Sequence, residues 1–137
     1  MTDKLLELAE RCEKATGPDR ELDCEIAVAA LGFFVAEPRY KGDVRYCYKD
    51  SEGVTHQPGN AGDMLARAFT ASLDAALTLV PEGWHISFMS QDRYTQRSML
   101  ALARNGDNSG KIAPCEDAAT PALALTAAAL KARSQQQ

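Results

Sequence analysis

The sequence predicts a single α+β domain in which helices pack on both faces of a small antiparallel or mixed β-sheet, an α/β/α sandwich. Segments with helical periodicity stand near both ends of the chain, and an alternating apolar strand begins at Trp84. Residues 98–104 form a second strand that is apolar on both faces. Because such a strand needs cover on both sides, we expect helices above and below the sheet.

Length and composition indicate one ordinary globular domain covering residues 1–137. Hydrophobic residues make up 45% of the chain and charged residues 25%. The formal net charge of −4 argues against extended nucleic acid as a partner, since a nucleic-acid backbone requires a basic face. No apolar run is long enough to span a bilayer, and the N-terminus has no signal-peptide pattern. We therefore expect a cytoplasmic protein (in the host cell cytoplasm if a phage encodes it) without a membrane partner.

Residues 3–31 are expected to form a helical hairpin. Leu5, Leu8 and Cys12 recur at helical spacing, and Gly17–Pro18 ends one helix and opens the next. The following region, residues 33–68, is the least regular part of the chain. Its expected elements are strands at 44–48 and 54–56, a turn at 50–53 and a loop at 57–63.

The remaining part, residues 70–133, is expected to hold two helices with strands between them. Thr70 is expected to cap the first of these helices, and Thr120–Pro121 the second. The expected elements are a helix at 70–80 with a core face of Leu73, Ala76, Leu77 and Val80, strands at 84–89, 98–104 and 111–113, a polar connection at 90–97, and a helix at 120–133.

Three stretches in this order and spacing resemble the phage ABA-sandwich domain family. They are GPDRELD at 17–23, TASLDAALTLVPEGW at 70–84 and AATPALAL at 118–125. The resemblance implies a small protein carried by a phage or prophage, with helices on both faces of a sheet. It implies no particular activity, because the recurrent residues are mainly caps, turns and a buried tryptophan.

Several residues have both a functional and a structural interpretation. Ser72 and Asp74 could form a hydrogen-bonding pair at a pocket edge, but capping and the helix dipole explain them more simply. Trp84 could stack on a ring, although a core position is favoured. His85 and Asp74 could form an acid–base pair, yet no nucleophile stands in a recognisable motif beside them. The sequence thus favours a protein without catalytic residues over an enzyme.

The cysteines and histidines do not form a metal-binding pattern. None of the four cysteines belongs to a CxxC pair, and the chain has only two histidines. We expect free, mostly buried cysteines, no metal site and no cofactor. The residues concerned are Cys12, Cys24, Cys47, Cys115, His56 and His85.

Two clusters combine basic and aromatic residues. Arg93, Tyr94 and Arg97 could grip a phosphate and stack a base, whereas the simpler alternative is a solvated loop. A second cluster lies on or near the strand at 44–48, and we include its members among the candidate ligand-binding residues. They are Arg45, Tyr46 and Tyr48, with Arg39, Tyr40 and Lys41 just before them.

These observations leave three functional hypotheses. The first is a non-enzymatic phage or prophage accessory protein that sequesters a small anionic, nucleotide-type signal of host defence. The second is an interaction protein without a small-molecule site, which oligomerises or binds a host protein. The third, a nucleotide-processing enzyme, has the least support. Because small binders often build pockets between subunits, we expect a homo-oligomer.

Overall fold

The computed structural model describes residues 2–31, 34–36, 45–49, 55–56, 68–106 and 112–135. In these ranges the chain forms four helices and six strands. In chain order they are α1 (Thr2–Lys14), α2 (Arg20–Leu31), β1 (Phe34–Ala36), β2 (Arg45–Lys49), β3 (Thr55–His56), α3 (Leu73–Leu77), β4 (Trp84–Gln91), β5 (Ser98–Arg104), β6 (Ile112–Ala118) and α4 (Pro121–Gln135).

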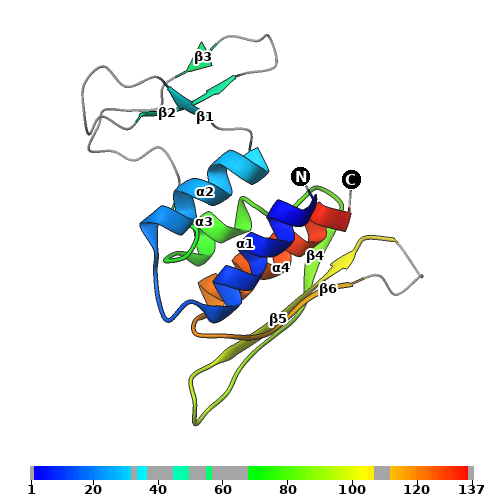
Figure 1. Cartoon of the computed structure of the whole chain (residues 1–137). Helices are drawn as coiled ribbons and strands as arrows, with labels where there is room; N and C mark the ends of the chain where they lie inside the picture. Colours follow the sequence, from blue (N-terminus) through cyan, green and yellow to red (C-terminus); the bar gives the residue numbers. More distant parts are fainter. Residues whose placement is uncertain are drawn as a thin grey trace.

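The strands form two antiparallel sheets, in the orders β1-β2-β3 and β4-β5-β6. The second sheet carries the helices, with α4 against β5 and β6 and with α1 against α4 and β6. α2 packs on α1, and α3 packs on α4 (Figure 1). The predicted α+β class is therefore confirmed.

The helices lie on one face of the β4-β5-β6 sheet, which differs from the predicted cover on both faces. Figure 1 shows all four helices on the same side of this sheet, and β1-β2-β3 lies beyond α2. The reason is the apolar stripe of α1, where Leu5, Leu8 and Cys12 are buried. This stripe packs on α4 and doubles the helical layer, so within the described ranges no helix reaches the opposite face.

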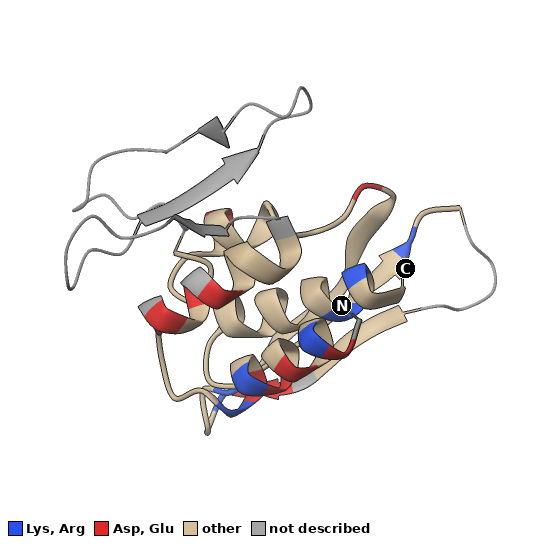
Figure 2. Cartoon of the chain, turned by 45° about the horizontal axis from the view of Figure 1, so that its top comes forward, with Lys and Arg blue, Asp and Glu red and all other residues tan. Residues whose placement is uncertain are grey.

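α4 is the centre of the hydrophobic core. Every residue from 122 to 130 is buried, because the helix contacts α1 and α3 as well as two strands. Alanine occupies most of these positions, so neighbouring backbones can approach closely. Figure 2 shows the consequence for charge, since acidic and basic residues gather on α1 and α2 while α4 carries them only near its end.

α3 is shorter than predicted, covering Leu73–Leu77 instead of 70–80. Its predicted cap is also wrong, since Ser72 caps the helix and Thr70 does not. After Leu77 the backbone bonds run from i to i−3, as in Leu79 N–H to Ala76 O at 3.0 Å, which tightens the chain and rotates its faces. As a result Leu73 and Leu77 are 38% and 46% exposed, and Leu79 is buried in their place.

The strands within residues 33–68 and the strand β6 differ in part from those predicted. β2 and β3 match the expected strands within a residue or two, but β1 was not expected. β6 continues to Ala118, although the sequence indicated a strand only over 111–113. The sequence did not predict the rest of this strand because Pro114 and the charged residues after it are uncommon in strands. Proline occurs in sheets only at edges or bulges, and β6 is an edge strand. The loop predicted at 57–63 lies outside the described residues.

Candidate functional site

The predicted ligand-binding residues do not come together where their side chains are described. Trp84 begins β4 and Arg93 follows its other end, and at about 3.3 Å per residue the strand from Trp84 to Gln91 alone spans roughly 23 Å. The predicted residues occupy four places: Arg93, Tyr94 and Arg97 at the β4–β5 hairpin, Ser72 and Asp74 at the start of α3, Trp84 in the core, and Arg45, Tyr46 and Tyr48 on β2, whose side chains lie outside the described part.

The β4–β5 hairpin is closed by the carboxylate of Asp92. Asp92 Oδ1 accepts hydrogen bonds from the backbone N–H groups of Tyr94 at 2.8 Å and Thr95 at 2.9 Å. These bonds, first the one from Thr95, lower the pKa of Asp92. Gln96 completes the turn with φ of 64°, and Tyr94 is 90% exposed at the tip. The hairpin thus presents one aromatic ring to solvent from a well-defined turn.

Arg97 is held by other parts of the protein. Its Nε donates to Asp117 Oδ1 at 2.5 Å, and its guanidinium also reaches the carbonyl oxygen of Glu13 on α1 at 3.5 Å. The bond to Asp117 raises the pKa of Arg97. Arg97 therefore links the start of β5 to β6 and α1, so it is not free to pair with Arg93 around the Tyr94 ring as predicted.

Ser72, Asp74 and Trp84 have structural positions. Ser72 Oγ accepts from Ala75 N–H at 3.3 Å, which is the N-cap bond, and Asp74 is an exposed acid in the first turn of α3. Trp84 is only 7% exposed and belongs to the main core cluster. The structural interpretations of these three residues agree with their surroundings.

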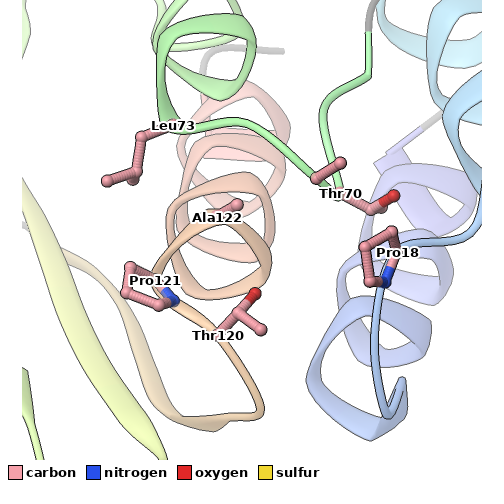
Figure 3. A pocket seen from close by; sticks show the side chains of 7 residues that line it. Pro18, Thr70, Leu73, Thr120, Pro121 and Ala122 are labelled. Carbon is pink, nitrogen blue, oxygen red and sulfur yellow. The ribbon is translucent and has the colours of Figure 1, made fainter.

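A pocket of about 260 Å³ lies where the starts of α2, α3 and α4 approach one another. Figure 3 shows Thr120 and Pro121, at the start of α4, across the pocket from Thr70 and Pro18. The Thr120 hydroxyl oxygen in this lining already has a partner, because it accepts from Leu123 N–H at 3.2 Å. The pocket walls are mainly apolar and suit a small apolar group. They are formed by Pro18, Thr70, Ala71, Leu73, Thr120, Pro121 and Ala122.

Beside this pocket, Thr70 joins a buried polar network. Its N–H and its hydroxyl donate to Asp23 Oδ1 at 2.9 and 2.8 Å, and its Oγ1 accepts from Asp19 N–H at 2.8 Å. Both Thr70 and Asp23 are fully buried. The network joins the start of α2 to the segment before α3. Because the N–H and hydroxyl of Thr70 already bond to Asp19 and Asp23, they are not available to a ligand in the pocket.

Cys12 and Cys115 are free and buried, as predicted for the cysteines. Burial raises the pKa of Cys12 to about 12, and the neighbouring Cys115 adds to this effect. Burial likewise raises the pKa of Cys115 to about 11. Thiols in this state are poor nucleophiles at neutral pH because the reactive thiolate is scarce.

The sheet face opposite the helices carries several outward apolar side chains of β4, β5 and β6. Directly paired residues share a face, so Phe88, Ala101 and Pro114 form one row across the three strands. Phe88 is 50%, Met99 46% and Ile112 49% exposed. We call this surface the open face, and it comprises Phe88, Met99, Ala101, Ala103, Ile112 and Pro114.

The open face was not among the predicted sites, although one signal for it was present. The sequence of β5 alternates buried Leu100 and Leu102 with Met99, Ala101 and Ala103, which indicates a strand apolar on both faces. That pattern predicts that both faces are covered, but it does not specify by what. The covering layer was assigned to the chain's own helices, and the structure places those helices elsewhere.

Comparisons with protein families, with curated proteins and with solved structures find no match to this chain. The resemblance to the phage ABA-sandwich domain family therefore stays a prediction from the sequence. None of the helices in the described ranges is both long and apolar enough to cross a membrane.

Proposed function

We propose that this chain is a non-enzymatic binding protein whose contact surface is the open face of the β4-β5-β6 sheet. The observation that carries the proposal is the row of Phe88, Ala101 and Pro114, flanked by the half-exposed Met99 and Ile112. Contiguous exposed apolar patches on soluble proteins mark interaction sites. Methionine and aromatic side chains are also enriched at the centres of protein interfaces.

The chemistry of the described side chains supports binding over catalysis. The two described thiols have raised pKa values, and the Ser72 hydroxyl serves as a helix cap. His85 lies on an exposed strand and hydrogen-bonds to Asn105 Oδ1. These groups lie on different elements and do not form a nucleophile–base pair.

The partner class that fits the open face is a protein with an apolar surface of its own. The face of an open sheet gives small molecules less enclosure than the concave sites that they prefer. A second apolar surface can bury Phe88, Met99 and Ile112 together. This proposal corresponds to the second hypothesis from the sequence, an interaction protein without a small-molecule site.

Site-specific photo-crosslinking tests this proposal. A benzoyl-phenylalanine at Phe88 should form adducts with a partner protein in the native cells, and the same probe at Leu6, 44% exposed on α1, should not. The additional change Met99→Lys should remove the Phe88 adducts while the circular dichroism spectrum stays unchanged. Equal adducts from both probe positions, or none from Phe88, would contradict the proposal. Adducts only with a second copy of the chain would assign the face to self-assembly instead.

A second candidate function is the sequestration of a small anionic, nucleotide-type ligand such as a host defence signal. It is favoured by one observation, the exposure of Tyr94 beside Arg93 on the closed turn of the hairpin. A panel of cyclic nucleotides should then raise the melting temperature of the protein, and Arg93→Ala should abolish the shift. A shift that survives both Arg93→Ala and Tyr94→Ala would exclude the hairpin as the site.

A further inference from the structure

The two edge strands of the β4-β5-β6 sheet differ in their availability for pairing. On β6, the carbonyl oxygen of Pro114 accepts from Lys131 Nζ at 2.8 Å, and that of Ile112 accepts from Gln135 Nε2 at 3.0 Å. Both donors come from α4. Pro114 in addition has no N–H to offer to a neighbouring strand. The chain thus uses its own side chains and a proline to close the β6 edge against strand addition.

The alternation of the ladder identifies which groups of β4 point away from β5. Gly83 O accepts from Asn105 N–H at one end, and Asp92 N–H donates to Arg97 O at the other, both at 2.7 Å. In an antiparallel pair every second residue bonds to its neighbour. Counting inward from both ends places the N–H and C=O groups of Ile86, Met89 and Gln91 on the outer edge. At Ile86 and Met89 no other described residue meets these groups.

β4 also lacks most of the usual protection of an edge strand. Its sequence, WHISFMSQ, contains no proline, lysine, arginine or carboxylate. Its one irregularity is a bulge between Ile86 and Phe88, which leaves Phe88–Gln91 as a regular paired stretch. Among the described residues, none therefore closes the edge of β4 against a further strand.

The side chains of β4 that face the helices extend beyond the helical layer. Met89 pairs with the buried Leu100, and Ile86 pairs with the buried Leu102. Yet Met89 is 52% and Ile86 37% exposed, since α4 packs on β5 and β6. An added strand would bring new apolar side chains beside both residues. The exposed backbone edge and the exposed side chains thus require the same kind of partner.

We propose that β4 pairs antiparallel with β4 of a second copy of this chain, about a two-fold axis, to form a six-stranded sheet. Two copies of an uncharged strand approach without repulsion between their own side chains, because the nearest charges, those of Glu82, Asp92 and Arg93, lie beyond the two ends of β4. In a two-fold contact Ile86 and Met89 of each copy contact the same strand of the other. Because the β6 edge is closed, the assembly stops at two.

This inference goes beyond the proposed function, which assigns the open face to a different partner. Edge pairing would leave that face uncovered and would join two copies of it into one wider surface. The dimer and the partner contact therefore depend on different groups. The first depends on the outward N–H groups of β4, and the second on side chains such as Met99.

Sedimentation of the full chain from about 1 µM to about 500 µM tests the dimer directly. The mass should rise from 14.8 kDa towards twice that value. Met89→Pro removes an outward N–H at a position where an edge strand tolerates proline. It should raise the dissociation constant of the dimer by about tenfold or more. Met89→Leu keeps both the N–H and the apolar side chain, and it should associate like the wild type. Circular dichroism should show both variants folded.

The opposite results are equally clear. A monomer across the whole concentration range, or association unchanged by Met89→Pro, would overturn the dimer. Slow amide exchange at Ile86 and Met89 in dilute monomer would also overturn it, because another segment of the chain would then cover the edge. Met99→Lys separates the two proposals: it should leave sedimentation unchanged even if it abolishes the crosslinks of the open face.

Discussion

A single buried hydroxyl, that of Thr70, connects two helical segments that are far apart in the sequence. It bonds to Asp19 and Asp23 of the N-terminal hairpin, while the next residues lead into α3. A buried carboxylate that loses such a donor keeps the full cost of its desolvation. The network therefore makes the position of α3 depend on α2.

Thr70→Val should lower the free energy of unfolding by about 1–3 kcal/mol, because it leaves polar groups of Asp19 and Asp23 short of a partner. Thr78→Val is the matched control, since the Thr78 hydroxyl donates to Ala75 O at the exposed end of α3. The control should cost less than about 0.5 kcal/mol. Urea denaturation measures both values. Equal losses of unfolding free energy in the two variants would show that the buried Thr70 hydroxyl stabilises the protein no more than the exposed Thr78 hydroxyl does.

The thiols of Cys12 and Cys115 predict a loss of stability in alkaline solution. Above the ordinary thiol pKa of 9.0, the unfolded chain releases the Cys12 proton while the folded protein holds it up to about pH 12. The contribution of the buried, protonated Cys12 thiol to the free energy of unfolding is fully present below pH 9.0. It is lost as the pH rises from 9.0 towards 12. The slope is about 1.4 kcal/mol per pH unit for each thiol that titrates only when unfolded.

Cys12→Ala should make this alkaline slope shallower. The variant loses some stability at every pH through its small cavity, but that offset does not vary with pH. Urea denaturation in steps between pH 8 and pH 10 gives the slope. Parallel curves for the variant and the wild type would refute the assignment to Cys12.

At the level of single residues, the sequence predicted caps and core positions well where local chemistry decides them. Trp84 was expected in the core and Thr120 at a helix start, and both predictions are confirmed. The prediction that Thr70 caps α3 was wrong, because Thr70 and Ser72 are both good capping residues. Only the hydrogen bond of Thr70 to Asp23, which the fold provides, distinguishes them. Arg97 could not be placed either, since Asp117 approaches it through the pairing of β5 with β6.

Among the elements, the β4–β5 hairpin has the most specific local control. Asp92 holds the turn through the N–H groups of Tyr94 and Thr95, and these bonds favour the ionised carboxylate. Since the pKa of Asp92 is lowered on folding, its contribution is present above the ordinary aspartate pKa. It is lost as the pH falls through the lowered folded value.

Asp92→Ala should therefore loosen the turn without unfolding the protein. The amides of Tyr94 and Thr95 should exchange with solvent several-fold faster, and the melting temperature should change little, because the tip is exposed. Asp92→Asn keeps an accepting oxygen and should restore most of the protection. Hydrogen exchange read by NMR distinguishes the three proteins. Unchanged exchange in Asp92→Ala would mean that the strands alone define the turn.

The length of the elements was predicted where the pattern is long and regular. The periodicity of α1 and the alanine-rich run of α4 gave both helices nearly as observed. The apolar stripe from Leu73 to Val80 was equally regular, but it ends early because a tighter turn places Leu79 in the core. A periodic pattern states which residues are apolar, and packing decides how many of them continue the helix.

For the whole molecule, stability depends on the position of α4 between the sheet and the other helices. Leu125 on α4 is fully buried, and Leu125→Ala should cost about 2–5 kcal/mol. Leu77 is 46% exposed on α3, so Leu77→Ala should cost less than about 1 kcal/mol. Thermal or urea denaturation compares the two. A similar cost for both would contradict the central position of α4.

The one-sided sheet explains which part of the fold the sequence could not predict. The apolar residues on both faces of β5 were recognised correctly, but the predicted cover by helices is found on one face only. Nothing in one chain's pattern distinguishes cover by its own helices from cover by another molecule. The open face and the β4 edge follow only from the packing of α1 on α4, which no local signal records.

Because α4 comes after the other described elements in the chain, its central position in the core affects folding during synthesis. The ribosome releases α1 first, but the helix that buries Leu5 and Leu8 emerges only after every other described element. At about 5–20 residues per second, this delay is on the order of ten seconds. During that time the nascent chain exposes apolar side chains without a core to receive them. Its folding therefore cannot complete until α4 has left the ribosome, and its yield should depend on chaperones that hold nascent chains.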